Sequence, residues 1–147
     1  MILAEMTSPE IDALPRDIVT LIPVASCEQH SLHLPLFTDS LIGEEVARRV
    51  NQRCADDVLV LPIQWLGYSQ HHIRYTGTIS AISETHLLLM MDIVASMVGH
   101  RFKKILIQIS IDLLLPFKNN KSSPSGNNSI NHSKSTKLKR SVTHSVV

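Results

Sequence analysis

The segment from Ser26 to Asp39 contains the residues whose types and spacing could do chemistry. Glu28 and His30 are two residues apart, so on an extended chain their side chains project to the same side. Asp39 adds a second carboxylate where the next helical pattern starts. Two carboxylates and an imidazole suit a divalent transition metal of the zinc or manganese kind. This segment therefore indicates a candidate metal site.

Each of these residues also has a purely structural interpretation. Asp39 could cap the helix that starts beside it, and His30 and His33 could be surface or hydrogen-bonded histidines. Glu28 is harder to explain in this way, because it follows a buried apolar strand. A carboxylate there is costly unless a cation or hydrogen-bond donors compensate for its burial. The residues alone leave both interpretations open.

Residues 67–72 form a second polar cluster, which ends in the adjacent histidines His71 and His72. Neighbouring side chains point apart on a strand, so the two imidazoles are not expected to bind one ion. We expect them to line a pocket or to hydrogen-bond to metal ligands. A solvated loop is the alternative. His86, His100, His132 and His144 are assigned no role.

The elements that must position these residues follow from the hydrophobic pattern. Short apolar runs alternate with longer helical patterns, which indicates an α/β fold with a parallel sheet. Ligands bind at the carboxyl ends of strands in such sheets, and the polar segment begins where the first strand ends. The expected elements are strands at 19–24, 58–62 and 104–109, a short strand or edge at 77–80, a helix from Ser40 to Val50 capped by Thr38 or Asp39, and a helix at 84–98.

The second of these helices is unusually apolar. Residues 87–98 are hydrophobic on nearly every face, and Gly99 follows them. A helix of this kind is expected to be largely covered, either by the sheet or by a partner subunit. It is also the longest apolar stretch of the chain, but it contains Asp92 and is shorter than the roughly 20 residues of a membrane span.

The charge of the chain divides it into two parts. Residues 1–116 hold 8 Lys and Arg against 13 Asp and Glu, whereas residues 117–147 hold 6 Lys and Arg and no acidic residue. We interpret 1–116 as the folded domain and 117–147 as a basic, disordered tail rich in serine, asparagine and lysine. Nucleic-acid binding by this tail is not expected, since it has no aromatic residue beyond Phe117 and no fold.

Composition excludes several further classes of protein. The two cysteines, Cys27 and Cys54, are too few for a disulfide scaffold and are expected to be small buried residues. Residues 1–17 carry acids and prolines and show no secretory signal pattern. We therefore expect a cytoplasmic protein.

Several short motifs occur in a fixed order along the chain. They are Ser26-Cys27-Glu28-Gln29-His30, His33-Leu34-Pro35, Thr38-Asp39, Leu61-Pro62, Gly67-Tyr68-Ser69, His72, Gly77-Thr78-Ile79-Ser80 and Ser83-Glu84-Thr85. Through these motifs the sequence resembles the creatininase (creatinine amidohydrolase) family over about residues 18–109. The resemblance implies a three-layer α/β/α fold with a mostly parallel sheet. It also implies a homo-oligomer that hydrolyses linear or cyclic amide C–N bonds other than peptide bonds.

The resemblance further implies a role for individual residues. Two divalent metals, zinc or manganese, would share one site, with Glu28 as a ligand of one metal, His30 as a ligand of the other and Asp39 as the bridging carboxylate. Ser69 and His72 would be catalytic residues in the loop over this site. A water held between the two metals would attack the carbonyl of a small amide substrate.

The sequence departs from the family after its third strand. The family has a loop of Asn-Gly-His-Gly-Gly-Asn type there, whereas this chain continues as Gln108-Ile109-Ser110-Ile111-Asp112, without histidine or glycine. We therefore expect a C-terminally truncated, incomplete fold that binds one ion or none. The abrupt change is typical of a spliced or frameshifted end. Two hypotheses follow: a metal-dependent amidohydrolase, or an inactive homologue that acts through association with full-length subunits.

Overall fold

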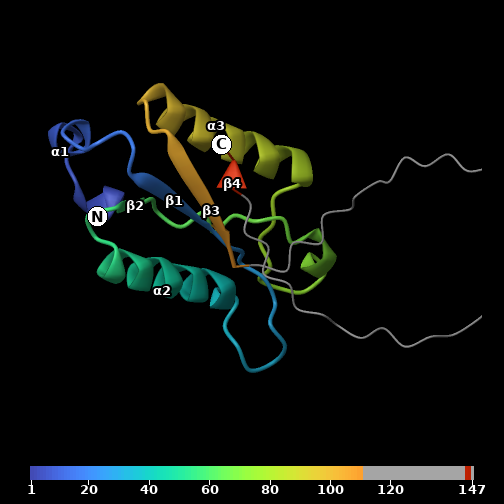
Figure 1. The fold of residues 1–147 in the computed structure, drawn as a ribbon. Helices are drawn as coiled ribbons and strands as arrows, with labels where there is room; N and C mark the ends of the chain where they lie inside the picture. The colour runs from blue at the N-terminus through green and yellow to red at the C-terminus, as the bar shows by residue number, and fades with distance from the viewer. Residues whose placement is uncertain (111–144, 147) are drawn as a thin grey trace, which may run out of the picture.

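The protein is a parallel sheet between two helices, as described by a computed structural model of residues 1–110 and 145–146 (Figure 1). The strands lie in the order β2-β1-β3-β4. The central strand β1 pairs in parallel with β2 and β3, and β4 is antiparallel to β3. The strands are β1 (Val19–Val24), β2 (Val58–Val60), β3 (Lys104–Ile109) and β4 (Ser145–Val146). The expected α/β fold and its three parallel strands are confirmed.

Two long helices connect the strands and cover opposite faces of the sheet (Figure 1). Helix α2 (Thr38–Arg53) joins β1 to β2, and helix α3 (Ser83–Gly99) joins β2 to β3. The prediction that the side chain of Thr38 or Asp39 caps α2 is wrong. Phe37 is the N-cap residue and makes no side-chain cap. Asp39 lies within the first turn, so its carboxylate is available to other partners.

The hydrophobic core has two layers because side chains alternate between the faces of a strand. On the α3 side, Ile22 and Leu59 pack with Met97 and Phe102. On the α2 side, Leu21 packs with Ala47, Val58 and Val60. Every residue of β1 after Val19 is buried. The strand is therefore a rigid base for the polar segment that follows it.

Helix α3 is covered on one face only within the described part of the chain. Met90, Ile93 and Val94 pack against the core together with Met97. Hydrophobic side chains on the remaining surface are exposed: Leu87 60%, Leu88 60%, Met91 56% and Val98 57%. Among the described residues the sheet covers only one side of the helix, so cover by the sheet alone is wrong, and cover by a partner subunit stays a prediction. None of the described helices is long and apolar enough to span a bilayer.

Shorter elements complete the described structure. The short strand or edge expected at residues 77–80 is a single antiparallel bridge between Cys27 and Ile79. Cys27 is buried as expected, but Cys54 is exposed, because it directly follows α2 at the surface; both are free thiols. Apart from Ser145–Val146, the tail predicted at 117–147 lies outside the described residues. The remaining elements are the 3-10 turns η1 (Leu3–Glu5) and η2 (Gln70–His72) and helix α1 (Ser8–Asp12).

Candidate metal centre

Glu28, His30 and Asp39 meet just beyond the carboxyl end of β1. Glu28 and His30 lie in the segment that follows this strand, and Asp39 reaches the same place from the first turn of α2. One ligand atom from each residue lies within 4.8 Å of the others. Glu28 is buried, and the other two are partly buried. The structure thus brings together all three metal ligands that the sequence predicts.

The Asp39 carboxylate is held by two neighbours. The Ser26 hydroxyl donates a hydrogen bond of 2.9 Å to its Oδ2, and His30 Nε2 lies 3.0 Å from its Oδ1. Ser26 is itself fixed, because the Ser40 hydroxyl donates to its carbonyl oxygen at 2.8 Å. Both serines are fully buried. The carboxylate is therefore oriented before any ligand binds.

The His30 ring is oriented by a backbone carbonyl. Its Nδ1 lies 2.9 Å from the Glu28 carbonyl oxygen, so Nδ1 carries the proton and Nε2 faces the carboxylate cluster. Such a bond to the second nitrogen is typical of metal-binding histidines. Partial burial lowers the pKa of His30, but the Glu28 carbonyl and the Asp39 carboxylate together outweigh it, so the pKa is raised above its ordinary value.

The loop before α3 is pinned against this end of the sheet. Gly67 packs so closely on the Ala25 carbonyl oxygen that a Cβ atom at this position would collide with it. The Gly67 carbonyl accepts a bond of 3.0 Å from the Ala81 amide, and the Ser69 amide donates to the Ser80 hydroxyl at 2.7 Å. These contacts fix the part of the loop that carries Ser69 and His72.

Ser69 and His72 each present a buried polar atom toward the interior. Ser69 is fully buried. Its Oγ and the Nδ1 of His72 find no hydrogen-bond partner among the described residues. Buried polar atoms in native proteins nearly always have a partner. These two atoms are therefore unsatisfied among the described residues, and the catalytic roles expected for Ser69 and His72 stay predictions.

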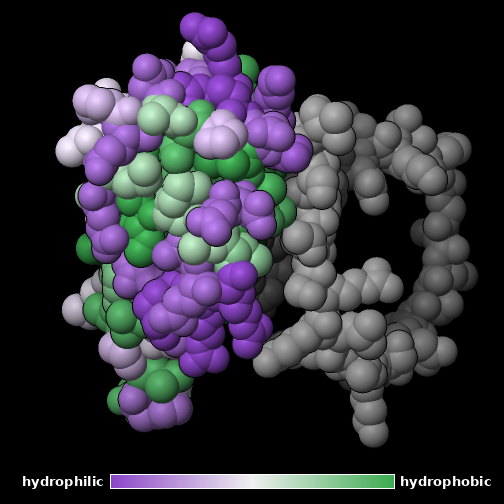
Figure 2. Space-filling view, turned by 60° about the vertical axis from the view of Figure 1, so that its left-hand side comes forward, coloured by the Kyte–Doolittle hydropathy of each residue, from purple (hydrophilic) through white to green (hydrophobic). Residues whose placement is uncertain are grey.

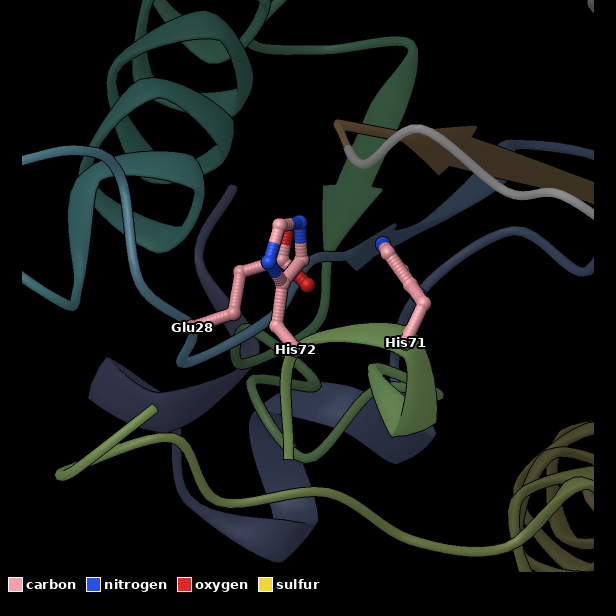
Figure 3. A group of neighbouring side chains, drawn as sticks. All are labelled: Glu28, His71 and His72. Atoms are coloured by element: carbon pink, nitrogen blue, oxygen red, sulfur yellow. The ribbon is translucent and has the colours of Figure 1, made fainter. Parts of the chain in front are cut away.

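The adjacent histidines converge instead of pointing apart. His71 and His72 lie in the 3-10 turn η2, and their ring centroids are 4.2 Å apart. One nitrogen of each lies within 4.8 Å of a Glu28 carboxylate oxygen, so the three residues form a second possible ligand group (Figure 3). The prediction that the two imidazoles do not bind one ion assumed a strand, whereas both residues lie in a 3-10 turn, so the strand argument does not apply to them; their part in metal binding stays a prediction. The adjacency of the two histidines is the one signal in the sequence that could have indicated this group.

Other candidate residues lie apart from the centre. His33 is exposed in the loop between β1 and α2, and His100 is exposed after α3. A ring nitrogen of His86 forms a hydrogen bond with the Leu66 carbonyl. Asp112 lies outside the described residues, as do His132 and His144.

A cavity of about 1030 Å³ lies at the opposite end of the sheet, between the N-terminal segment and the end of α3. Figure 2, which turns that side of the molecule forward, shows hydrophobic and hydrophilic residues mixed over its surface. No residue of the metal centre lines this cavity. We therefore place the candidate chemistry at Glu28, His30 and Asp39.

Fold and site together define an α/β protein with a candidate metal centre at the carboxyl end of its central parallel strand. The family model "Creatininase: Creatinine amidohydrolase" matches residues 4–108. This chain belongs to the creatininase family.

Individual relatives agree with this assignment. The chain is 38% identical over 98 residues to the mycofactocin precursor peptide peptidase of Mycobacterium tuberculosis (strain CDC 1551 / Oshkosh), a match covering 61% of this chain and 38% of that protein. A crystal structure of creatinine amidohydrolase (creatininase) is 30% identical with a TM-score of 0.66, covering 72% of this chain and 43% of the other. The chain thus spans less than half the length of these relatives.

Two further creatininase structures are similar over the same share of the chain. One, described as "Creatininase Mn", is 26% identical with a TM-score of 0.64. The other, a mutant creatininase of "Zn-Zn type", is 29% identical with a TM-score of 0.65. Both cover 72% of this chain and 43% of their own.

Proposed function

We propose that this chain carries a metal-dependent amide-hydrolysing site of creatininase type, in which Glu28, His30 and Asp39 hold a divalent cation. The observation that supports this function is the convergence of the three ligand atoms within 4.8 Å at the carboxyl end of β1. Two carboxylates and one imidazole match the donors that zinc and manganese accept. Zinc and manganese forms of related creatininases support the same choice of ions.

The surroundings of the three residues fit a cation. The buried Glu28 carboxylate forms no ion pair with a lysine or arginine of the described chain. A buried carboxylate without a counter-charge is costly. A bound divalent cation would remove this cost, and the oriented side chains of His30 and Asp39 would complete its ligand set.

Other residues of the chain would orient the metal ligands, contact the substrate and exchange a proton. A divalent cation, when bound, lowers the pKa of water and polarises a carbonyl group. Ser26 and the Glu28 carbonyl hold Asp39 and His30 in the ligand orientation. The unpartnered hydroxyl of Ser69 is free to donate to a substrate carbonyl, and His72 Nδ1 is free to exchange a proton with the leaving nitrogen.

The substrate class follows from the relatives only in outline. One relative is named as a creatinine amidohydrolase and another as a precursor peptide peptidase. The substrates in these two names both contain an amide C–N bond. The bond is part of a ring in creatinine and is a peptide bond in the precursor peptide. We accordingly propose a linear, cyclic or peptide amide as the substrate of this chain.

A substrate panel tests this function. The chain is assayed against creatinine, formyl amides and short peptides, with added Mn²⁺ or Zn²⁺. Hydrolysis of at least one substrate is expected. Asp39→Asn should lower its rate by more than about 100-fold, since even loss of a partner that only orients a ligand costs 10–100-fold. His33→Ala is the matched control, because His33 is an exposed histidine of the same segment. Turnover that is absent, or unaffected by Asp39→Asn, would overturn the proposal.

A second candidate function is that of a non-catalytic subunit that binds a longer member of the family. Two observations favour it: the chain has no Asn-Gly-His-Gly sequence after β3, and α3 leaves Leu87, Leu88 and Met91 exposed. Co-expression with a full-length creatininase tests it. A stable complex, together with no turnover by the isolated chain, would support this function, whereas an active monomer would exclude it.

A further inference from the structure

We propose that Glu28, His71 and His72 form a second cation site, with the ligand preference of zinc. This inference rests on the proposed metal centre only through Glu28, which belongs to both groups. The second site would be built by η2, which precedes α3, rather than by α2. The first ligand group uses neither histidine. A zinc ion held here would occupy His72 Nδ1, so His72 would then be a ligand and not the residue that exchanges a proton.

The 3-10 turn η2 places both histidines beside Glu28. Figure 3 shows the His71 and His72 side chains projecting from the same side of η2 toward the carboxylate of Glu28. All three ligand atoms lie within 4.8 Å of one another. An ion placed among them would therefore be within reach of three protein ligands after small rotations of the side chains.

The site combines a buried carboxylate with a buried ring nitrogen. Glu28 is only 6% exposed and has no cationic partner within the described chain. His72 Nδ1 is buried and has no hydrogen-bond partner there. A carboxylate without a counter-charge thus lies beside a ring nitrogen without a hydrogen-bond partner. A divalent cation would satisfy both at once.

The donor set selects the ion. Two imidazoles and one carboxylate form the three-ligand arrangement of catalytic zinc sites, which leaves one position open for water or substrate. A carboxylate has two oxygens, so Glu28 can serve both ligand groups at the same time. Two ions sharing it would lie about 3.5–4 Å apart, as in other two-metal sites. The shared carboxylate would offset part of the repulsion between the two cations.

Zinc stoichiometry of the full chain tests the proposal. Zn²⁺ alone is added to a background carrying His132→Gln and His144→Gln, which removes histidines outside the described residues, and bound zinc is measured by elemental analysis after dialysis. Two zinc ions per chain are expected. His71→Gln should reduce this to one. His100→Gln, which replaces an exposed histidine far from the site, should retain two.

A second variant separates this inference from the proposed function. Asp39→Asn should lose the ion of the first group and keep one zinc on Glu28, His71 and His72. Histidine ring nitrogen NMR shifts should then move for His71 and His72 when zinc is added. Unchanged stoichiometry in His71→Gln and unmoved NMR signals would overturn the second site while leaving the first intact. Loss of zinc in His71→Gln alone, with Asp39→Asn unaffected, would support the second site and contradict the first.

Discussion

Ser26 orients a residue of the candidate metal centre without being one of the proposed ligands. It is fully buried, and its hydroxyl donates to Asp39 Oδ2. Ser26→Ala should therefore weaken Mn²⁺ or Zn²⁺ binding by about 10–100-fold, the range for loss of a group that orients a ligand. Isothermal titration of the variant against the wild type measures this. Ser96→Ala, on the exposed part of α3, is the control, and equal affinities for wild type and Ser26→Ala would contradict the prediction.

His30 should make the stability of the metal-free protein depend on pH. Its pKa is raised above the ordinary value of 6.5 in the folded state, so its contribution to the free energy of unfolding is complete below that value. The contribution is lost as pH rises through the higher folded-state pKa. In the presence of a chelator, His30→Gln should therefore be less stable than the wild type at pH 5.5, and the gap should narrow at pH 8.5.

Urea unfolding at both pH values measures this gap. His33→Gln controls for the removal of a histidine, because its side chain is exposed and lies outside the ligand cluster. A gap of the same size at both pH values would show that the ion pair between His30 and Asp39 does not stabilise the metal-free chain.

At the scale of elements, Gly67 determines how closely the η2 loop approaches the sheet. A Cβ atom at this position would collide with the backbone oxygen of Ala25, which cannot move aside cheaply. Gly67→Ala should therefore lower the free energy of unfolding by about 1–3 kcal/mol. It should also displace Ser69 and His72 and lower the rate of any hydrolysis.

Gly99→Ala is the matched control for this prediction. Nothing lies within 4 Å of a Cβ atom at Gly99, which ends α3. The same substitution there should stabilise the protein by about 0.4–1 kcal/mol. Thermal unfolding of both variants checks the pair. Similar shifts in both would mean that the loop does not pack as tightly on Ala25 as described.

The strands and long helices were predictable because their apolar residues repeat with a clear period. The run around β1 is buried on both faces, so a continuous hydrophobic stretch is its natural pattern. The start of α2 was not predictable from Thr38 and Asp39 alone. Both are common capping residues, but the Asp39 carboxylate is bound to Ser26 and His30 instead.

The site was predictable in part for the same reason. Glu28, His30 and Asp39 lie near the end of a strand and the start of a helix, whose relative positions the parallel sheet determines. The group of Glu28, His71 and His72 depends on the conformation of η2, a three-residue turn without hydrophobic periodicity. Tertiary contacts of the loop, such as that between Gly67 and Ala25, set this conformation.

At the scale of the whole molecule, the outer surface of α3 is its largest unexplained feature. Leu87, Leu88, Met91 and Val98 are each more than half exposed and lie beside the covered face of the helix. Full burial of a side chain of this size is worth about 1.5–3 kcal/mol. We therefore expect this surface to drive association, either with a second copy of the chain or with a longer member of the family.

Leu88→Glu combined with Met91→Glu should shift the protein toward the monomer, because association would then bury two charges. Sedimentation velocity over a range of concentrations measures the shift. Thr85→Glu combined with Ser96→Glu adds the same charge to the polar side of α3, so it should leave the distribution of species unchanged. If wild type and both double variants are monomeric at every concentration, the α3 surface does not mediate self-association. Co-purification with a longer family member would then test the other partner proposed for this surface.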